Sequence, residues 1–193
     1  PVFANALHLA ADFTAGLRAL QADLAANGAR DEAYGVPYST VHIGMLQGGT
    51  ALNIVPDRAE LVFEYRHLAA DPAERIEARI REAAVAAAAP FGNVFPGARI
   101  EVEQYNAYPG LDVATDSPVA VLAQKLAQAN ETTKVAFGTE AGYFSGLGIP
   151  TVVCGPGSME GQGHKADEYV TLGQLTACEA MLGRVLEEIR SPA

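Results

Sequence analysis

The sequence is poor in the residues that mark several protein classes. It has two cysteines, no tryptophan and no apolar run of about 18 residues, so no membrane-spanning helix is expected. The sequence has only 13 Lys and Arg residues against 23 Asp and Glu residues, which gives a net charge of −10. An acidic surface repels a phosphate backbone, so nucleic-acid binding is not expected. Cys154 and Cys178 lie far apart in the sequence, which does not fit a disulfide framework or a thiolate metal site and favours a cytoplasmic protein.

What the sequence does contain is enough apolar material for a core. Hydrophobic residues make up 49% of the 193 positions. Near the N-terminus they recur at alternating spacings of four and three, which predicts an amphipathic helix. Asn27-Gly28 predicts a left-handed end for this helix. The predicted inward-facing residues are Ala6, Ala10, Phe13, Leu17, Leu20 and Leu24.

The following segment predicts two strands, a second helix and a third strand. Apolar and polar residues alternate in 40–46 and 59–68, as they do in half-buried strands. Residues 71–90 predict a helix that begins at Asp71-Pro72 and stops at Pro90. Apolar and polar residues alternate again in 100–103, which predicts the third strand. This order is typical of a split β-α-β layer, which normally has four strands and begins with one. We therefore expect the first strand upstream of Pro1, and a chain that is a piece of a longer protein.

A second part is predicted to begin near residue 109. Ser117-Pro118 predicts the start of a helix, and 135–137 predict a short strand. Residues 149–154 are an unbroken apolar run, typical of a strand that is buried on both faces of an α/β sheet. The predicted domains are 1–108 and 109–193. A last amphipathic helix is predicted with Leu175, Cys178, Leu182, Leu186 and Ile189 on its inner face.

The loop that follows the predicted strand 149–154 is the best candidate for a site. It lies at the carboxyl end of that strand, where α/β proteins place their ligands, and its glycines allow backbone N–H groups to approach an anion. His164 ends the loop beside Asp167 and Glu168, and neutral imidazole is the commonest metal ligand. One histidine is too few for a zinc site, so an ordinary surface histidine is the alternative.

Five short motifs carry a resemblance to a known family. They are GGTALNIVPD (48–57), FEYR (63–66), GTEAG (138–142), GPGS (155–158) and HKADE (164–168). Together, and in this order, they resemble the metal-dependent deacylases and exopeptidases, a family that includes acetylornithine deacetylase, succinyl-diaminopimelate desuccinylase, aminoacylase and glutamate carboxypeptidase. The resemblance implies an α/β fold in two parts. A ferredoxin-like α+β lid or dimerisation domain without its first strand precedes the C-terminal part of a zinc-exopeptidase-like α/β/α catalytic domain.

The resemblance also implies roles for individual residues. Two positions of the lid would hold the substrate carboxylate, often from the partner subunit, beside a glycine loop of the catalytic domain. An acidic position would suit the amine of ornithine, and a histidine would bind the metal. Asn53 and Arg66 match the two lid positions, and Gly155 and Gly157 match the glycine loop. Glu140 matches the acidic position, and His164 matches the metal ligand. From the residues alone, a turn residue is the preferred interpretation of Asn53, and an exposed strand residue is the preferred interpretation of Arg66.

The activity implied by the resemblance is removal of the acetyl group from N-acetylornithine, a small acylated amino acid, in arginine biosynthesis. One or two zinc or cobalt ions would serve the full-length enzyme. No catalytic residue is assigned to this chain, because the general base and the other metal ligands would precede Pro1, and we expect this chain alone to bind no stoichiometric metal and to be inactive. The alternatives are another deacylase, desuccinylase or carboxypeptidase of the family, or a dimerisation or binding module without activity. A homodimer through the lid is expected.

Overall fold

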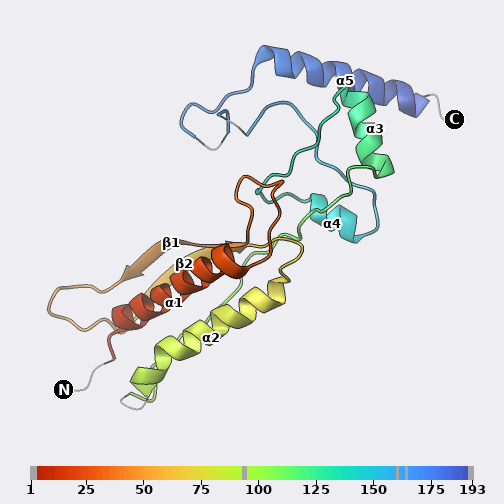
Figure 1. The fold of residues 1–193 in the computed structure, drawn as a ribbon. Helices are drawn as coiled ribbons and strands as arrows, with labels where there is room; N and C mark the ends of the chain where they lie inside the picture. The colour runs from red at the N-terminus through yellow and green to blue at the C-terminus, as the bar shows by residue number, and fades with distance from the viewer. Residues whose placement is uncertain (1–3, 93–94, 160, 164, 191–193) are drawn as a thin grey trace. The chain divides into compact units, whose positions relative to one another are not determined.

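The computed structural model describes residues 4–92, 95–159, 161–163 and 165–190 of the chain (Figure 1). The chain folds as two compact units. Unit 1 contains the residues up to Ala107 together with Lys134–Ala136, and unit 2 contains Tyr108–Thr133 and the residues from Phe137 onward. None of the described helices combines the length and the apolar character needed to cross a membrane.

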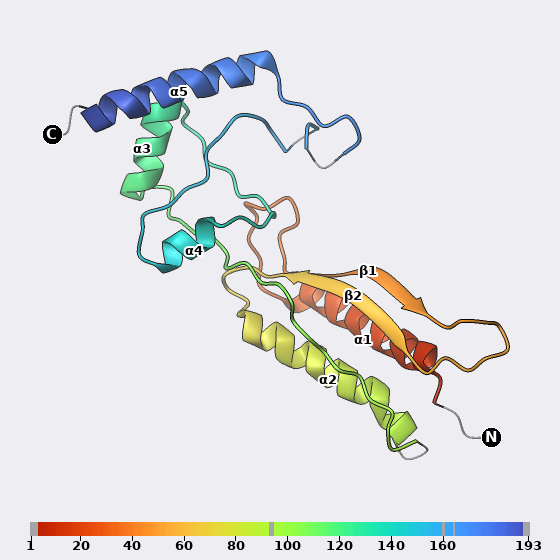
Figure 2. The same ribbon diagram turned by 180° about the vertical axis from the view of Figure 1, so that it is seen from behind.

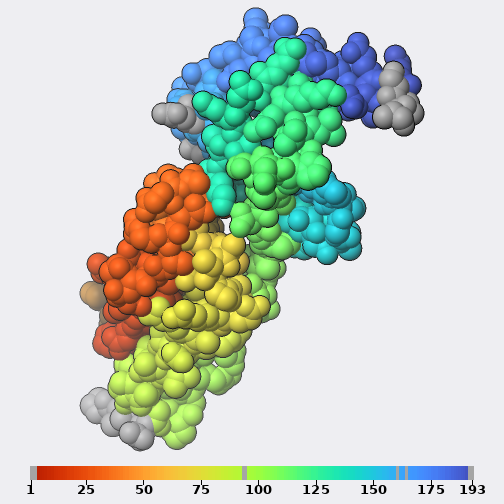
Figure 3. All heavy atoms as spheres, turned by 45° about the vertical axis from the view of Figure 1, so that its right-hand side comes forward, coloured from red at the N-terminus to blue at the C-terminus, as the bar shows by residue number. Residues whose placement is uncertain are grey.

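Unit 1 is a hairpin of two antiparallel strands with two helices on one face. Its elements are α1 (Ala6–Asn27), β1 (Thr40–Gly48), β2 (Ala59–Arg66) and α2 (Ala73–Gly92). Figure 2 shows the hairpin in front of α1, with α2 alongside, and Figure 3 shows the red and yellow-green segments packed together. The strands pair from Thr40 opposite Arg66 to Gly48 opposite Ala59, with a bulge between Ile43 and Met45.

The predicted inner stripe of α1 is confirmed. Phe13, Leu17, Leu20 and Leu24 are buried in the core of unit 1, where they meet β1 and α2. The predicted left-handed end is wrong, because Gly28 has a φ of −72°. Glycine is needed there for another reason: a Cβ at Gly28 would lie 2.5 Å from the carbonyl oxygen of Leu24, to which the N–H of Gly28 donates.

The predicted third strand does not form. Ile100 and Val102 pack against the core, as an alternating strand would, but among the described residues the sheet consists of β1 and β2 alone. A strand requires a neighbouring backbone for its hydrogen bonds, and this segment has side-chain packing without such a ladder. The carbonyl of Val102 instead accepts from Arg81 of α2, at 3.2 Å.

A buried polar cluster joins β1, β2 and α2. The Ser39 hydroxyl donates to a carboxylate oxygen of Asp71 at 2.7 Å and accepts from the backbone N–H of Leu68 at 3.0 Å. Ser39 is fully buried and Asp71 is 6% exposed. The cluster therefore satisfies three polar groups that have little access to water.

We expect Ser39→Ala to lower the free energy of unfolding of unit 1 by about 1–3 kcal/mol, because it leaves a buried carboxylate and a buried N–H without a partner. Urea unfolding followed by far-UV circular dichroism measures this. Thr50→Ala, at an exposed threonine, is the matched control and should change little. Equal midpoints for the two variants would contradict the assigned role of the cluster.

The described residues of unit 2 form three helices: α3 (Pro118–Ala127), α4 (Ala141–Gly146) and α5 (Leu172–Arg190). The Ser117 side chain caps α3 by accepting from the N–H of Ala120, as the sequence predicts. Helices α3 and α5 are joined by a hydrogen bond from Arg184 to the carbonyl of Leu126 and by the ion pair of Lys125 with Glu188, at 3.0 Å.

Three predictions for the second half of the chain are wrong in the described structure. Residues 135–137 and 149–154 form no strand, and Ile149 and Val153 are 50% and 55% exposed. A buried strand needs neighbours on both edges and cover on both faces, and the described residues provide neither. The predicted inner stripe of α5 is exposed except for Cys178, which is half-buried. The half-buried residues of the helix are Gln174, Cys178, Met181, Arg184 and Val185.

Candidate functional site

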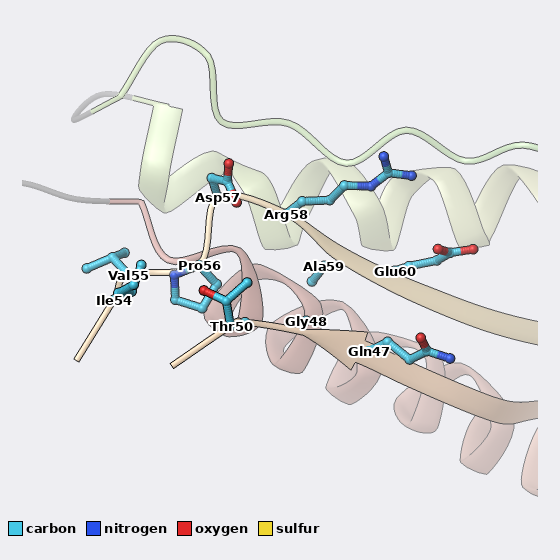
Figure 4. Close-up of a pocket in the computed structure, with 11 residues that line it drawn as sticks. Gln47, Gly48, Thr50, Ile54, Val55, Pro56, Asp57, Arg58, Ala59 and Glu60 are labelled. Carbon is cyan, nitrogen blue, oxygen red and sulfur yellow. The ribbon is translucent and has the colours of Figure 1, made fainter. Parts of the chain in front are cut away.

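The loop between β1 and β2 carries Asn53 at an exposed tip. The base of the loop is held to the start of α1, because the carbonyl of Pro56 accepts from the N–H of Ala6 at 3.0 Å. A shallow open pocket of about 300 Å³ lies where the strands enter the loop, and Figure 4 shows the residues that line it. The side chain of Leu52, next to Asn53, is fully exposed. The loop therefore presents Asn53 outward from a fixed base. The pocket is lined by Gln47–Thr50 and Ile54–Glu60.

Arg66 lies at the far end of β2 from this loop. Its guanidinium donates from Nε to Oε1 of Glu64 at 3.0 Å, with Nη2 forming an ion pair with the same oxygen at 3.0 Å, and it donates from Nη1 to the carbonyl of Ala136. The side chains of Arg66 and Glu64 are about half exposed. Arg66 is therefore already positioned on a carboxylate, and a carboxylate of a ligand can take the place of Glu64.

A second contact holds the segment Lys134–Ala136 against unit 1. The ammonium of Lys134 lies 2.8 Å from the carboxylate of Asp31 and 5.5 Å from the centre of the Tyr34 ring. The hydrogen bond from Lys134, followed by that from the N–H of Ala33, lowers the pKa of Asp31. This anchor was missed by sequence reasoning, because Lys134 and Asp31 are 103 positions apart and belong to no local pattern.

Tyr65 fixes the end of β2 beside Arg66. Its hydroxyl donates to the carboxylate of Glu77 on α2 at 2.7 Å. Burial, and then the hydrogen bond to Glu77, raise the pKa of Tyr65 to about 12. The phenol therefore stays protonated at neutral pH and keeps donating to α2, which holds this end of the strand in place.

Asn53 and Arg66 cannot act on one small ligand within one chain. β2 separates the loop, at Ala59, from Arg66, and a strand rises about 3.3 Å per residue, so they lie roughly 20 Å apart. If both residues hold the carboxylate of one amino acid, one of them comes from another copy of the chain.

In unit 2, Glu140 is the residue that precedes α4, and its side chain is exposed. Gly155 has open space around it, and Gly157 has a φ of +105°, which only glycine adopts readily. His164 lies outside the described residues. Gln162, which sequence reasoning missed, orders the glycine loop, because its side-chain oxygen accepts from the N–H of Ser158 at 2.7 Å.

Gln162 also ties this loop to α5. Its side-chain amide pairs with that of Gln174 at 3.1 Å, and Gln162 is 9% exposed. Among the described residues, no three His, Cys, Asp or Glu side chains come together in a group that could hold a metal ion. The described part of the chain therefore does not fit a zinc or cobalt ion by itself.

Comparisons with known proteins show which family the chain belongs to. Residues 1–91 match the family model of the peptidase dimerisation domain. The chain is 35% identical to acetylornithine deacetylase of Myxococcus xanthus over 160 residues, which are 81% of the chain and 40% of that protein. It is 30% identical to acetylornithine deacetylase of Proteus mirabilis over 156 residues, 80% of the chain and 38% of that protein. The chain belongs to the family of deacylases and exopeptidases that includes acetylornithine deacetylase.

A solved structure shows the same fold. The crystal structure of aminopeptidase PepT from Bacillus cereus matches 97% of the chain with a TM-score of 0.66 and 24% identity, over 46% of its own length. The predicted family and its α+β fold class are thus confirmed. The chain spans about two fifths of the length of the curated relatives that it matches. The roles of Asn53, Arg66, Glu140, Gly155, Gly157 and His164 stay predictions.

Proposed function

We propose that this chain supplies the lid and part of the catalytic domain of an amidohydrolase that removes the acetyl group from N-acetylornithine or a close relative. The observation that carries the proposal is the 35% identity, over 81% of the chain, to a protein named acetylornithine deacetylase. In this proposal the enzyme is a cytoplasmic homodimer, supported by the dimerisation-domain match of residues 1–91.

The described side chains suit the two ends of such a substrate. Arg66 holds the carboxylate, replacing its contact with Glu64. Asn53 reaches the same carboxylate from the second copy, because β2 places it too far from Arg66 within one chain. The exposed carboxylate of Glu140 pairs with the side-chain amine of ornithine. The glycine loop at Gly155 and Gly157 offers backbone N–H groups beside the carboxylate.

The proposal includes zinc or cobalt, with His164 as one ligand. A complete ligand set needs side chains beyond those described, because the described residues form no suitable group. No step of the reaction is therefore assigned to a metal on this chain.

The test is hydrolysis by the product of the complete reading frame that contains this chain, with N-acetylornithine, an N-succinyl amino acid and a dipeptide offered separately. We expect release of acetate from N-acetylornithine to exceed the other rates. His164→Ala should lower bound metal and rate together by at least about 100-fold, since ligand loss destroys the site. Lys165→Ala is the neighbouring control. Full metal content in the His164 variant removes it from the ligand set, and preference for the dipeptide overturns the proposed substrate.

A second candidate is a dimerising module without activity of its own, which the family match of residues 1–91 favours for the 193-residue chain. Elemental analysis of the purified chain distinguishes a metal-binding enzyme from a dimerising module without activity. We expect well under one equivalent of zinc. Stoichiometric zinc on this chain would contradict the second candidate and would show that the ligand set is complete within the 193 residues.

A further inference from the structure

The half-buried face of α5 carries two sulfur atoms. Cys178 and Met181 belong to the half-buried residues of this helix, and Gln174 lies one turn before Cys178. Residues three or four positions apart lie on the same face of a helix, with their Cβ atoms about 5–6 Å from each other. A long side chain on a helix leans toward the preceding turn, so the thioether of Met181 extends toward Cys178.

A third sulfur atom meets this face from outside the helix. The thiol of Cys154 donates to the thioether of Met181 at 3.6 Å. The side-chain amide of Gln162 pairs with that of Gln174 at 3.1 Å. These two contacts lie one turn after and one turn before Cys178, and all five residues belong to unit 2. The fold therefore brings two thiols that are far apart in the sequence to the same stretch of α5.

The spacing of the sulfur atoms suits a shared metal ion. A metal–thiolate bond is about 2.3 Å long, so two sulfurs on one ion lie roughly 3.8 Å apart at a tetrahedral angle and roughly 4.0 Å apart at a trigonal angle. The sulfurs of Cys154 and Met181 are 3.6 Å apart. An ion can therefore bind between them after a small movement, and Cys178, one turn from Met181, can supply a third ligand.

This set of ligands selects a soft metal. Thiolate and thioether sulfurs favour Cu(I), whereas carboxylate and carbonyl oxygens favour magnesium and calcium. In the described part of the chain, no three His, Cys, Asp or Glu side chains come together to hold a metal ion, so nitrogen and oxygen ligands do not complete a harder site here. Cys154 is exposed, Cys178 is half-buried and both are free thiols, so an ion can reach them from solvent.

We propose that Cys154, Cys178 and Met181 form a three-sulfur binding site for Cu(I). On binding, the ion forms bonds to two thiolate sulfurs and to the neutral thioether, and the two thiol protons pass to solvent. No electron is transferred, because copper enters and stays as Cu(I). The inference goes beyond the proposed deacetylase activity, since none of these three side chains holds the substrate or the zinc or cobalt ion in that proposal.

The experiment is an anaerobic titration of the full 193-residue chain with Cu(I), in competition with the coloured chelator bathocuproine disulfonate. We expect one equivalent to bind, with sulfur ligands alone in X-ray absorption at the copper edge. Cys154→Ser and Cys178→Ser should each weaken binding at least about 100-fold, because a hydroxyl is a hard ligand. Met181→Leu, which conserves volume, should keep the fold and weaken binding about 10-fold.

Met45→Leu is the matched control, because Met45 is an exposed methionine on β1, in the other unit. It should leave the Kd for Cu(I) unchanged. Failure of the wild-type chain to bind one equivalent overturns the inference. So does wild-type affinity in Cys178→Ser, or equal affinity in Met181→Leu and Met45→Leu. Acetate release tests the deacetylase proposal separately, so failure of one does not imply failure of the other.

Discussion

Replacing Arg66 by alanine should raise KM for the acylated amino acid roughly 30- to 150-fold in the complete enzyme and should change kcat much less. A guanidinium that donates two hydrogen bonds to a carboxylate contributes on the order of 2–3 kcal/mol to binding. The side chain already donates one hydrogen bond from Nε to Glu64 and forms an ion pair with it through Nη2, so it is oriented for a carboxylate before the substrate arrives. Steady-state kinetics over a range of substrate concentrations measure the effect.

Arg66 also donates to the carbonyl of Ala136, so a purely structural role must be separated from substrate binding. Lys134→Met is the matched control, because it removes the contact with Asp31 that holds the same segment and leaves Arg66 in place. It should lower thermal stability and spare KM. Arg66→Lys should recover only part of the affinity, since an ammonium does not reproduce the two parallel hydrogen bonds. Equal KM values for Arg66→Ala and wild type would make Arg66 a structural residue.

The parts of unit 1 that could be predicted are those whose pattern is local. Four-three spacing placed the buried side of α1 correctly, from Phe13 to Leu24, and alternation located β1 and β2. The end of α2 shows the limit of such rules. Pro90 was expected to stop the helix, but the helix continues to Gly92, because a proline in the last turn disturbs few hydrogen bonds.

The rest depends on neighbours that no local pattern specifies. Residues 149–154 have the composition of a buried strand, yet a strand exists only where another backbone lies beside it. The leucines of α5 have helical spacing, but burial depends on what covers that face, and the described structure leaves them exposed while a neighbouring line that includes Met181 is half-buried. The contacts of Lys134 with Asp31 and of Gln162 with Gln174 could not be predicted either, because no local sequence pattern specifies these neighbours.

For the candidate site residues, too, the sequence predicts identity but not spatial arrangement. The motifs identify Asn53 and Arg66 as candidates, but only the register of the hairpin shows that they lie at opposite ends of β2. That separation makes a second copy of the chain part of the proposed site.

Gly142→Ala should be the most disruptive single-methyl substitution in unit 2. A Cβ at Gly142 would lie 1.9 Å from the carbonyl oxygen of Pro109 and 2.7 Å from its carbonyl carbon. Backbone atoms cannot move aside as a flexible side chain can, so either α4 or the segment at Pro109 must shift. Overpacking of this kind costs about 3 kcal/mol or more. Because Glu140 immediately precedes α4, a shift of the helix also displaces this proposed contact for the substrate amine.

Gly146→Ala is the matched control, since Gly146 ends the same helix and an added Cβ there meets nothing within 4 Å. It should leave stability unchanged or raise it by up to about 1 kcal/mol, because alanine favours helix over glycine. Urea unfolding of both variants, with KM for N-acetylornithine in the complete enzyme, gives two independent measurements. Gly142→Ala should lower stability and raise KM, whereas Gly146→Ala should do neither. If the two variants unfold alike, Pro109 does not pack against α4. If Gly142→Ala lowers stability with KM unchanged, then Glu140 does not hold the amine, because the helix that carries it has moved without consequence for binding.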